Sequence, residues 1–540
     1  MIGWFMRQKL EKSTKNIKLV QEQYLMSLIN QNGRTEYGKQ YKLYEIKSKT
    51  EFINVHPLTR IKHYEEYIGR MMKGETNVLT SKPPAMFAVT SGTSGKSSIV
   101  PTSNRHRFVF FKYAISIVVY SMMKAFPANK QLQKILKFFY TPRWRKSESG
   151  LLIGPSSSTP TNTRAILNLY STPKEGLNIL DEPVALYIHL LFGLRERDIG
   201  TIEANFSSTI YTAFKALEYH KETLVHDIMF GCLNSKLEID KETRNDLESL
   251  LIPDPERAKE IKGAFSKGSE GLAKRLWPNC HLVLCCDTGS FALQADMLRE
   301  SFCKGIHIYS PIYSASEGLI GLNIWPNEKP SRYLLLPETL FYEFIPIENT
   351  VMEQPKPLFL EEVKANHVYE LVITTGAGLY RYRFGDVVKV VSFYNQCPVI
   401  EFLYRGEKTS EAALYQALVE GSKNWQGLKL TDYCCAENSY VPYYLVFIEL
   451  DKADGTLSKE EKNMVYLFAV LYFQYLPDVC TEDSSKGSIL PMKLQTVRFG
   501  TFQELRQFTI ETTSASSNQY KCPRVLKRRE ALHFIMQRLK

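Results

Sequence analysis

Several features that would identify a common class of protein are missing from this sequence. The 10 cysteines among the 540 residues form no C-x-x-C pair, and the 10 histidines form no H-E-x-x-H motif. Neither a disulfide framework nor a zinc site is therefore predicted. Cys285-Cys286 and Cys434-Cys435 are adjacent pairs in apolar stretches, where thiols are most often small core residues. Residues 1–10 contain no long apolar segment typical of a secretory signal, so we expect a cytoplasmic protein.

Charge is not concentrated enough to indicate a nucleic-acid-binding protein. The 68 basic and 57 acidic residues give a net charge of +11 and are scattered, with a local excess only from Lys521 to Lys540. We interpret this as solvated surface, with an anionic-ligand surface as the alternative. The apolar stretch from Phe108 to Phe126 approaches the length of a membrane span, but Lys112 and Lys124 interrupt it. We predict a buried helix there and no membrane insertion.

The length exceeds what one hydrophobic core normally holds, so two or more domains are expected. Helical spacing of apolar residues runs from Leu10 to Asn30, and the longest helical tract is predicted from Asp181 to Gly231. His189 lies on an apolar face of that tract, where a hydrogen-bonded core histidine is a better interpretation than a metal ligand.

A phosphate-binding loop is predicted from Thr90 to Lys96. Ala85 to Val89 has the pattern of a buried strand, and the two glycines that follow allow backbone N–H groups to converge on an anion. The spacing excludes a Walker A loop, which needs four residues between its first glycine and the Gly-Lys pair. A Ser/Gly-rich surface loop is the alternative for this segment taken alone.

Two strands in the middle of the chain lead into polar turns. His281 to Cys286 precedes Asp287-Thr288-Gly289-Ser290 and a helix, which is the order at a ligand-facing strand end. Gly305 to Tyr309 leads into Tyr313 to Gly318, where an aromatic ring, two hydroxyls and the Glu317 carboxylate lie together. One carboxylate plus substrate phosphate is a usual way to hold Mg²⁺, although a surface turn would have the same composition.

A third cluster follows the strand from Tyr369 to Thr375. The turn Gly376-Ala377-Gly378 precedes an Arg-x-Arg-x-x-Asp pattern that ends at Asp386. A carboxylate placed in this way can accept hydrogen bonds from a ribose diol. The alternative for the pattern in isolation is a cross-strand salt bridge.

These three clusters, in this order, resemble the motifs of the adenylate-forming superfamily of acyl-CoA synthetases, nonribosomal-peptide adenylation domains and luciferases. Within it the chain is similar to the Gretchen Hagen family of acyl acid-amido synthetases. Thr90 to Lys96 follows the Ser-Ser-Gly-Thr-Ser motif with its basic end. The other two motifs are Tyr-x-x-Ser-Glu and Tyr-Arg-x-Gly-Asp, matched by Tyr313, Ser316 and Glu317 and by Tyr382, Arg383, Gly385 and Asp386. The similarity extends over almost the whole chain, including Asn518 to Arg524.

The resemblance implies a role for each site residue, with ATP and Mg²⁺ as cofactors. It implies that Lys521 and Glu317 are catalytic and that Glu317 also binds Mg²⁺. Lys408 lies in a Gly-Glu-Lys turn like that found elsewhere in the superfamily and would be a third catalytic residue. Asp386 would bind ribose, and the apolar segment from Phe108 to Phe126 would line the acyl pocket. The nucleotide-binding set would be Ser91, Thr93, Ser94, Lys96, Thr288, Gly289, Tyr313, Ser316, Arg383 and Asp386.

The implied fold is α/β, with a large N-terminal adenylation domain at residues 1–404 and a smaller mobile domain at residues 405–540. The hinge would lie near 405–408, and the small domain would be a two-layer α/β unit. The implied activity joins a small carboxylic acid to an amine, and an amino acid is the expected amine substrate. A thioester-forming CoA ligase and a catalytically inactive scaffold are the alternatives that the sequence leaves open.

Overall fold

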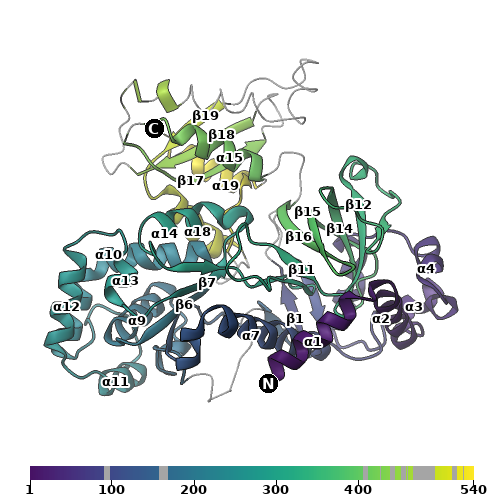
Figure 1. Cartoon of the computed structure of the whole chain (residues 1–540), viewed down its shortest axis with the longest axis horizontal. Helices are drawn as coiled ribbons and strands as arrows, with labels where there is room; N and C mark the ends of the chain where they lie inside the picture. Colours follow the sequence, from purple (N-terminus) through teal and green to yellow (C-terminus); the bar gives the residue numbers. More distant parts are fainter. Residues whose placement is uncertain are drawn as a thin grey trace. The chain divides into compact units, whose positions relative to one another are not determined.

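The computed structural model describes the chain apart from residues 91–97, 157–167, 406–410, 426, 438–443, 452–457, 459, 462, 466–492, 514–519, 527 and 540. The chain divides into two compact units (Figure 1). The first comprises Met1–Val89, Ile99–Phe384 and Lys389–Glu401, and the second comprises Thr90–Ser98, Gly385–Val388 and Phe402–Lys540. The hinge proposed near residues 405–408 stays a prediction, because most of that segment lies outside the described residues.

A parallel sheet forms the centre of the first unit. Its strand order is β3-β6-β7-β8, with bounds Lys134–Lys137, Ile199–Phe206, Leu282–Cys286 and His307–Tyr309. Apolar side chains of this sheet and of the surrounding helices share one core that contains the fully buried Trp277. The helices of this region are α9 (Glu182–Arg195), α10 (Ser207–Phe230), α11 (Lys241–Ser249), α12 (Pro255–Phe265), α13 (Leu272–Leu276) and α14 (Ala292–Glu300).

The single helical tract predicted from Asp181 to Gly231 is wrong, because strand β6 interrupts it. The tract is two helices, α9 and α10, separated by this strand, which pairs with β3 on one side and β7 on the other. Asp181 caps α9 by accepting the N–H of Val184 at 3.0 Å. A strand between two strong helices gives little local signal, because its stability comes from partners distant in sequence.

The prediction for His189, on α9, is confirmed. Its side chain is buried and hydrogen-bonded to the Phe139 carbonyl at 2.8 Å and to the Thr172 hydroxyl at 2.9 Å. Burial lowers its pKa to about 4, so this imidazole is neutral at physiological pH.

An eight-stranded sheet follows in the order β13-β12-β14-β15-β16-β11-β10-β9. Its β12–β14 pair is antiparallel along its whole length, from Phe341↔Thr374 to Pro346↔Tyr369. The strand bounds are β9 Ile312–Ser314, β10 Leu319–Leu322, β11 Tyr333–Leu335, β12 Phe341–Pro346, β13 Leu358–Phe359, β14 Val368–Thr374, β15 Tyr382–Tyr394 and β16 Cys397–Arg405. A third sheet, β2-β1-β5-β4, contains Ile99–Thr102, Met86–Val89, Leu152–Gly154 and Arg145–Lys146.

The N-terminal part of the first unit is helical. The tract predicted from Leu10 to Asn30 is two helices that meet at Lys15-Asn16. The helices before the first strand are α1 (Ile2–Thr14), α2 (Ile17–Asn32), α3 (Glu36–Gln40), α4 (Lys49–Val55) and α5 (Glu65–Met72).

The apolar stretch near residue 110 is helical, as predicted, but less buried than predicted. It consists of α6 (Asn104–Val109), a π-helical segment (Phe110–Ile115) and α7 (Ser116–Ala125). By length and composition the helix Asn104–Ala125 could cross a membrane, and only 24% of its most apolar window is buried. Such a helix is also common in soluble proteins. Phe108, Ile115 and Val119 leave a line of apolar side chains exposed on one side of it.

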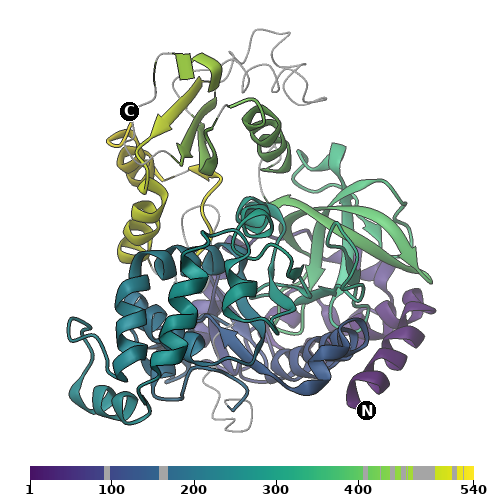
Figure 2. The ribbon, with the colours of Figure 1, turned by 60° about the vertical axis from the view of Figure 1, so that its left-hand side comes forward.

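The second unit contains a four-stranded sheet in the order β19-β18-β17-β20. Cys434 and Ala436 of β17 pack with α18 and α19, whereas Tyr433, on the opposite face, stacks on Tyr415 of α15. Helices therefore cover both faces (Figure 2), and the predicted two-layer arrangement is wrong. The bounds are β17 Leu430–Glu437, β18 Tyr444–Leu450, β19 Lys493–Val497, β20 Val525–Leu526, α15 Glu411–Ser422, α18 Thr501–Thr512 and α19 Arg529–Met536.

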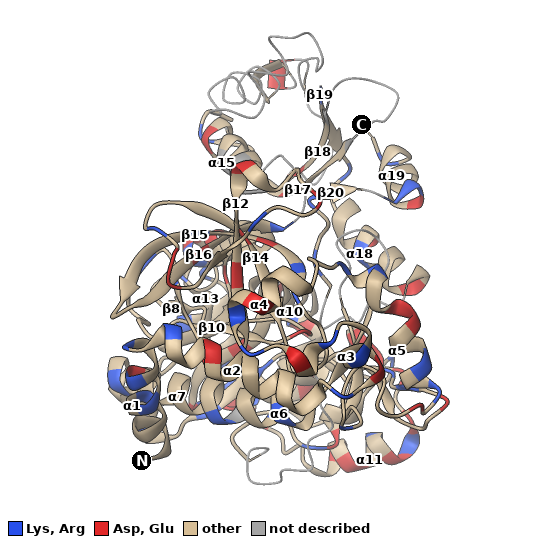
Figure 3. Ribbon diagram, turned by 90° about the vertical axis from the view of Figure 1, so that its right-hand side faces the viewer, with Lys and Arg blue, Asp and Glu red and all other residues tan. Residues whose placement is uncertain are grey.

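Lys and Arg residues are interspersed with Asp and Glu residues along the ribbon (Figure 3). Three of the four predicted core cysteines, Cys285, Cys434 and Cys435, are buried, whereas Cys286 is only partly buried.

Candidate active site

The predicted phosphate loop begins where β1 ends. Val89 pairs with Ile99 of β2, and the Thr90 N–H donates to the Ser98 carbonyl at 2.8 Å. The Ser98 N–H donates back to the Thr90 hydroxyl at 3.1 Å, so the two ends of the loop are held together. The predicted phosphate contacts Ser91, Thr93, Ser94 and Lys96 lie outside the described residues, as does Lys408.

The Thr288-Gly289 turn is fixed at the end of β7 by the preceding carboxylate. Asp287 accepts hydrogen bonds from Ser331 at 2.8 Å and from both Arg299 and Lys329 at 2.5 Å. Gly289 has a φ of +58°, a conformation that costs glycine little. Thr288 and Gly289 are themselves partly exposed, so both are accessible to a ligand.

Tyr333 of β11 connects this turn to the second predicted cluster. Its buried hydroxyl is hydrogen-bonded to Ser310 at 2.7 Å and also to the side chain of Thr288. Its ring lies against that of Tyr313, with the ring centroids 5.5 Å apart. Burial holds the pKa of Tyr333 well above its usual value, so the hydroxyl stays protonated. The predicted residues Thr288 and Tyr313 therefore lie on either side of one buried tyrosine.

The Ser316-Glu317 pair lies beside the end of β1. The Ser316 hydroxyl donates to the Val89 carbonyl at 3.5 Å, and reciprocal bonds between Ala315 and Gly318 close the turn. A Cβ at Gly318 would lie 2.7 Å from the end of the buried Leu340 side chain, so a larger residue there would require Leu340 to shift. Glu317 is only 4% exposed. The Ser316 contact thus brings the Ser316-Glu317 turn next to the strand that leads into the predicted phosphate loop.

Arg383 differs from its predicted role as a nucleotide contact. Its Nε and Nη2 donate to Glu370 at 3.0 and 2.5 Å, and its remaining N–H groups point to the carbonyls of Thr350, Met352 and Glu353 at 2.7–3.3 Å. All five donors of the guanidinium are therefore used within the protein. The cross-strand ion pair, the alternative interpretation of this motif, is what the structure contains.

Asp386 is on the same strand and is 3% exposed. Its Oδ1 lies 3.3 Å from the Nε of Arg405, the last residue of β16. Gly385 precedes it with a φ of +84°, which an L side chain rarely adopts. The glycine therefore sets the direction in which the Asp386 side chain leaves the strand.

Sequence reasoning missed the residues that hold the turn before this motif. The Tyr64 hydroxyl donates to the Tyr380 carbonyl at 2.7 Å and accepts the N–H of the same residue at 2.8 Å. Arg381 has a φ of +47°, and its guanidinium is bound to Glu343 and to the carbonyl of Ile53. The Arg-x-Arg spacing was the only available signal, because the partners are distant in sequence.

Lys521 is in the second unit, in a segment that is anchored by Arg524 three residues further along the chain. Arg524 is buried and ion-paired with Asp432, and its guanidinium lies 4.2 Å from the centroid of the Tyr433 ring. The Arg524 carbonyl accepts the N–H of Cys435 at 2.7 Å, which joins the segment to β17. Lys521 itself is partly exposed. The buried arginine thus fixes the backbone from which the lysine projects.

Comparison with known families decides where this arrangement belongs. The GH3 family N-terminal domain matches residues 6–308, the GH3 central domain residues 333–405 and the GH3 C-terminal domain residues 412–530. The chain belongs to the GH3 family. The resemblance inferred from the three motifs is therefore confirmed.

Individual GH3 proteins resemble the chain over nearly its full length. Jasmonoyl-L-amino acid synthetase JAR4 of Nicotiana attenuata is 31% identical over 96% of this chain and 92% of its own length. The 4-substituted benzoates-glutamate ligase GH3.12 of Arabidopsis thaliana is 29% identical over 98% and 96%. The solved structure of the GH3.15 acyl acid amido synthetase has a TM-score of 0.87 and 26% identity, covering 99% of this chain and 96% of its own. The predicted α/β fold, with a large N-terminal and a smaller C-terminal part, is confirmed.

The candidate residues are spread over all the GH3 segments. Thr288 and Gly289 lie in the N-terminal match, Arg383 and Asp386 in the central match and Lys521 in the C-terminal match. Tyr313 to Glu317 lie between the first two matches, and their place is established by the contacts with Val89 and Tyr333.

Proposed function

We propose that this protein is an ATP-dependent acid-amido synthetase that joins a small carboxylic acid to an amino acid. The observation that carries the proposal is the full-length similarity to the GH3.15 acyl acid amido synthetase, with a TM-score of 0.87. The match to all three GH3 domains supports it, because an acyl-adenylate enzyme needs residues from each of them.

The reaction has two steps. A carboxylate oxygen of the acid attacks the α-phosphorus of ATP, the bond to the β-phosphate oxygen breaks, and pyrophosphate leaves. The amine nitrogen then attacks the acyl carbon of the adenylate, loses a proton, and AMP leaves with the electron pair of the broken C–O bond. Such chemistry depends on positioning and on stabilisation of phosphate charge rather than on a protein nucleophile.

In the first unit we assign Thr288, Gly289 and Tyr313 to the adenine. Their partial exposure and their contacts with Tyr333 support this assignment. Ser316 is assigned to the phosphate side of the nucleotide, because it is bonded to the last residue of β1.

We assign Glu317 to Mg²⁺. A carboxylate that is 4% exposed, on a turn bonded to Val89, fits a hard cation that needs one or two protein oxygens and takes the rest from phosphate and water. When bound, the ion would neutralise phosphate charge.

The loop residues Ser91, Thr93, Ser94 and Lys96 are assigned to the phosphates on the basis of the motif. Asp386 is assigned to the ribose, and Lys521 to the acid carboxylate and the α-phosphate. Lys408 is kept as a further candidate from the Gly-Glu-Lys turn. We do not assign Arg383 to the nucleotide, because its donors are engaged with Glu370 and with main-chain carbonyls.

For the acid we propose a small molecule with a largely apolar body. The exposed apolar side chains of the helix Asn104–Ala125 support assignment of that segment to the acyl pocket, since such pockets are mostly hydrophobic. The named relatives differ in their acids, jasmonate in one and 4-substituted benzoates in another, so family membership alone does not identify the acid. We expect the reaction to take place in the cytoplasm.

The activity is tested by incubating the full-length protein with ATP, Mg²⁺, pooled carboxylic acids and pooled amino acids. New amides and AMP, identified by mass spectrometry, are the expected result. A parallel reaction with CoA in place of the amino acids distinguishes a thioester-forming ligase. Absence of ATP binding in a calorimetric titration would show that the protein is an inactive scaffold and would overturn the proposal.

Lys521→Ala separates the two steps. Loss of one preorganised contact at the reacting phosphate costs about 2.7–4 kcal/mol, or roughly 10²–10³ in rate. We expect this loss in acid-dependent pyrophosphate exchange, with amide formation from synthetic acyl-AMP largely retained. Lys423→Ala, at an exposed lysine of the same unit, is the matched control. Equal loss in both assays would show that Lys521 is structural or serves both steps.

A further inference from the structure

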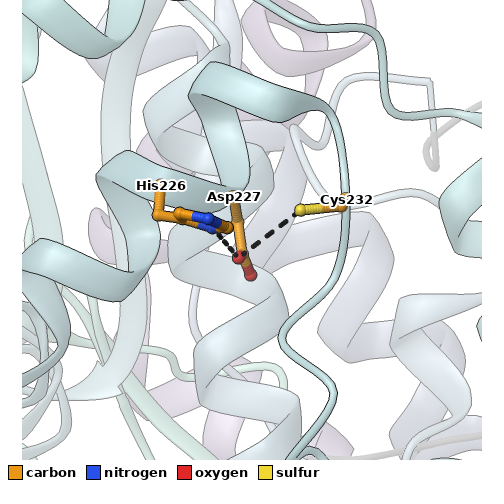
Figure 4. A group of neighbouring side chains, drawn as sticks. All are labelled: His226, Asp227 and Cys232. Carbon is orange, nitrogen blue, oxygen red and sulfur yellow. Dashed lines mark hydrogen bonds and ion pairs between the residues drawn. The ribbon is translucent and has the colours of Figure 1, made fainter.

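A group of three side chains at the C-terminal end of α10 has donor atoms suited to a transition metal. His226, Asp227 and Cys232 each offer one such atom, and these atoms all lie within 4.8 Å of one another (Figure 4). The His226 Nδ1 is 3.4 Å and the Cys232 Sγ 3.9 Å from the same carboxylate oxygen, Oδ1 of Asp227. No role in the amide-forming reaction involves these residues.

The chain reversal after α10 brings the cysteine back to the helix. Gly231 has a φ of +65°, and a Cβ there would lie 2.5 Å from the Pro253 nitrogen, so the position requires glycine. The Cys232 N–H then donates to the Asp227 carbonyl at 3.1 Å. The backbone, rather than the side chains alone, therefore fixes the distance between thiol and carboxylate.

The carboxylate is oriented by groups outside the cluster. Asp227 is 1% exposed, and its Oδ2 accepts the Tyr187 hydroxyl at 2.8 Å and the Asn234 N–H at 2.8 Å. These two bonds turn Oδ1 toward the imidazole and the thiol. Outer hydrogen bonds of this kind are what orient carboxylate and imidazole ligands in metal sites.

The distances suit a small ion with tetrahedral geometry. Zinc bonds of about 2.0–2.3 Å at tetrahedral angles place neighbouring ligand atoms about 3.4–3.6 Å apart. The observed 3.4 and 3.9 Å to Asp227 Oδ1 need only a small contraction, and the imidazole and the thiol, whose separation is at most 4.8 Å, would move closer to each other on binding. A nitrogen, an oxygen and a sulfur donor favour Zn²⁺ over Mg²⁺ or Ca²⁺, which take oxygen ligands. Cys232 is not part of a disulfide, so its sulfur can bind a metal ion as a thiolate.

We infer that His226, Asp227 and Cys232 form a zinc-binding site that ties the end of α10 to the loop that follows it. The side chain of His226 is 61% exposed, so the fourth coordination position is open to water. This site could not be predicted from the sequence, because the H-D-x₄-C spacing belongs to no standard zinc motif and the grouping depends on the turn at Gly231.

The competing interpretation is that Asp227 only closes the helix end. That role is fulfilled by its Oδ2 contacts with Tyr187 and Asn234 and does not need the other two side chains. The two interpretations predict different results when a thiophilic metal ion is added to the protein. Only a zinc-binding site would bind that ion through the Cys232 sulfur.

Cobalt(II) is the probe, because its thiolate complexes have a charge-transfer band in the near ultraviolet. The full-length protein, treated with chelator and dialysed, is titrated with Co²⁺ and then with Zn²⁺. We expect one Co²⁺ per chain with a thiolate band, displacement by Zn²⁺, and a rise in the thermal unfolding midpoint when Zn²⁺ is present. No thiolate band in the parent protein would overturn the inference.

Variants identify the ligands. Cys232→Ser should abolish the band and His226→Gln should weaken Zn²⁺ binding by at least about tenfold, whereas Tyr187→Phe should weaken it by about 10–100-fold. His533→Gln, at an exposed histidine of the second unit that belongs to no such group among the described residues, should leave binding unchanged. Circular dichroism confirms that each variant is folded. A band that persists in Cys232→Ser, or unchanged affinity in His226→Gln, would show that the metal binds elsewhere.

Discussion

The buried Arg383–Glu370 pair offers the sharpest test of how the third motif works. The side chains are 2% and 7% exposed, and Arg383 also donates to three carbonyls of the segment from Thr350 to Glu353. Arg383→Met keeps much of the apolar volume but removes every one of these donors. It therefore leaves a buried carboxylate without its cationic partner.

The expected loss is large because the partner charge stays behind. Removing one member of a buried ion pair costs about 3–5 kcal/mol, against roughly 5–15 kcal/mol for the stability of a typical domain. The exposed Arg197, paired with Asp254 at 2.9 Å with its own side chain 48% exposed, provides the contrast. Arg197→Met should cost no more than about 1 kcal/mol, because surface pairs contribute little.

The assay is urea unfolding followed by tryptophan fluorescence. Four of the five tryptophans lie in the first unit, so the signal reports mainly on that unit. The second measurement is the KM for ATP in the absence of urea. We expect Arg383→Met to lower the unfolding midpoint strongly and to change the KM for ATP by less than about twofold in the folded protein.

A double variant checks the physical cause. Adding Glu370→Met to Arg383→Met removes the uncompensated charge and should recover about 1–3 kcal/mol, the cost of an unsatisfied buried polar group. The reasoning is refuted if Arg383→Met is as stable as Arg197→Met while its KM for ATP rises tenfold or more. That result would indicate that Arg383 contacts the nucleotide.

Three further predictions address other residues. Asp386→Ala should lower kcat/KM for ATP by roughly tenfold to a hundredfold, because a charge-assisted hydrogen bond is lost. Asp246→Ala, at an exposed aspartate, should leave kcat/KM unchanged. An unchanged kcat/KM in Asp386→Ala would show that Asp386 is not part of the site. Glu317→Gln should shift the Mg²⁺ optimum upward, because an amide keeps the shape but loses the charge, and overlaying magnesium titrations would show that the ion is held elsewhere. Burial lowers the pKa of His189 to about 4. Below pH 6.5 the unfolded state therefore binds more protons than the folded state, and the free energy of unfolding falls by up to about 3 kcal/mol as the pH drops from 6.5 toward 4. Urea unfolding from pH 7 to pH 4 should therefore be less pH-dependent for His189→Gln than for the parent or for the exposed His533→Gln, and equal slopes would contradict the assignment.

The local structure around several of the proposed site residues could be predicted, because the residues that form each turn are adjacent in sequence. The buried strand before Thr90, the Tyr-x-x-Ser-Glu turn and the Gly385-Asp386 turn are local patterns, and each reflects a local requirement such as the positive φ of Gly385. The order of the three motifs then indicated the GH3 family and its fold. The phosphate loop itself and Lys408 stay predictions, since they lie outside the described residues.

Contacts between distant segments could not be predicted in this way. A cross-strand salt bridge was one of two interpretations of the motif that contains Arg383, but the sequence did not identify Glu370 as the partner. Tyr333 carried no motif although it links Thr288 to Tyr313. Strand β6 was missed for the same reason, because its pairing with β3 and β7 outweighs its short local pattern.

The sequence by itself thus indicated the family and the α/β fold, because these are encoded in short patterns with fixed spacing, and the residues that meet the nucleotide stay a prediction. Only the tertiary structure decided which charged side chains are buried in ion pairs. It also decided that His226, Asp227 and Cys232 lie together. The physical reason is that burial and ion pairing depend on segments brought together by folding, and a buried charge takes its role from the partner it meets there.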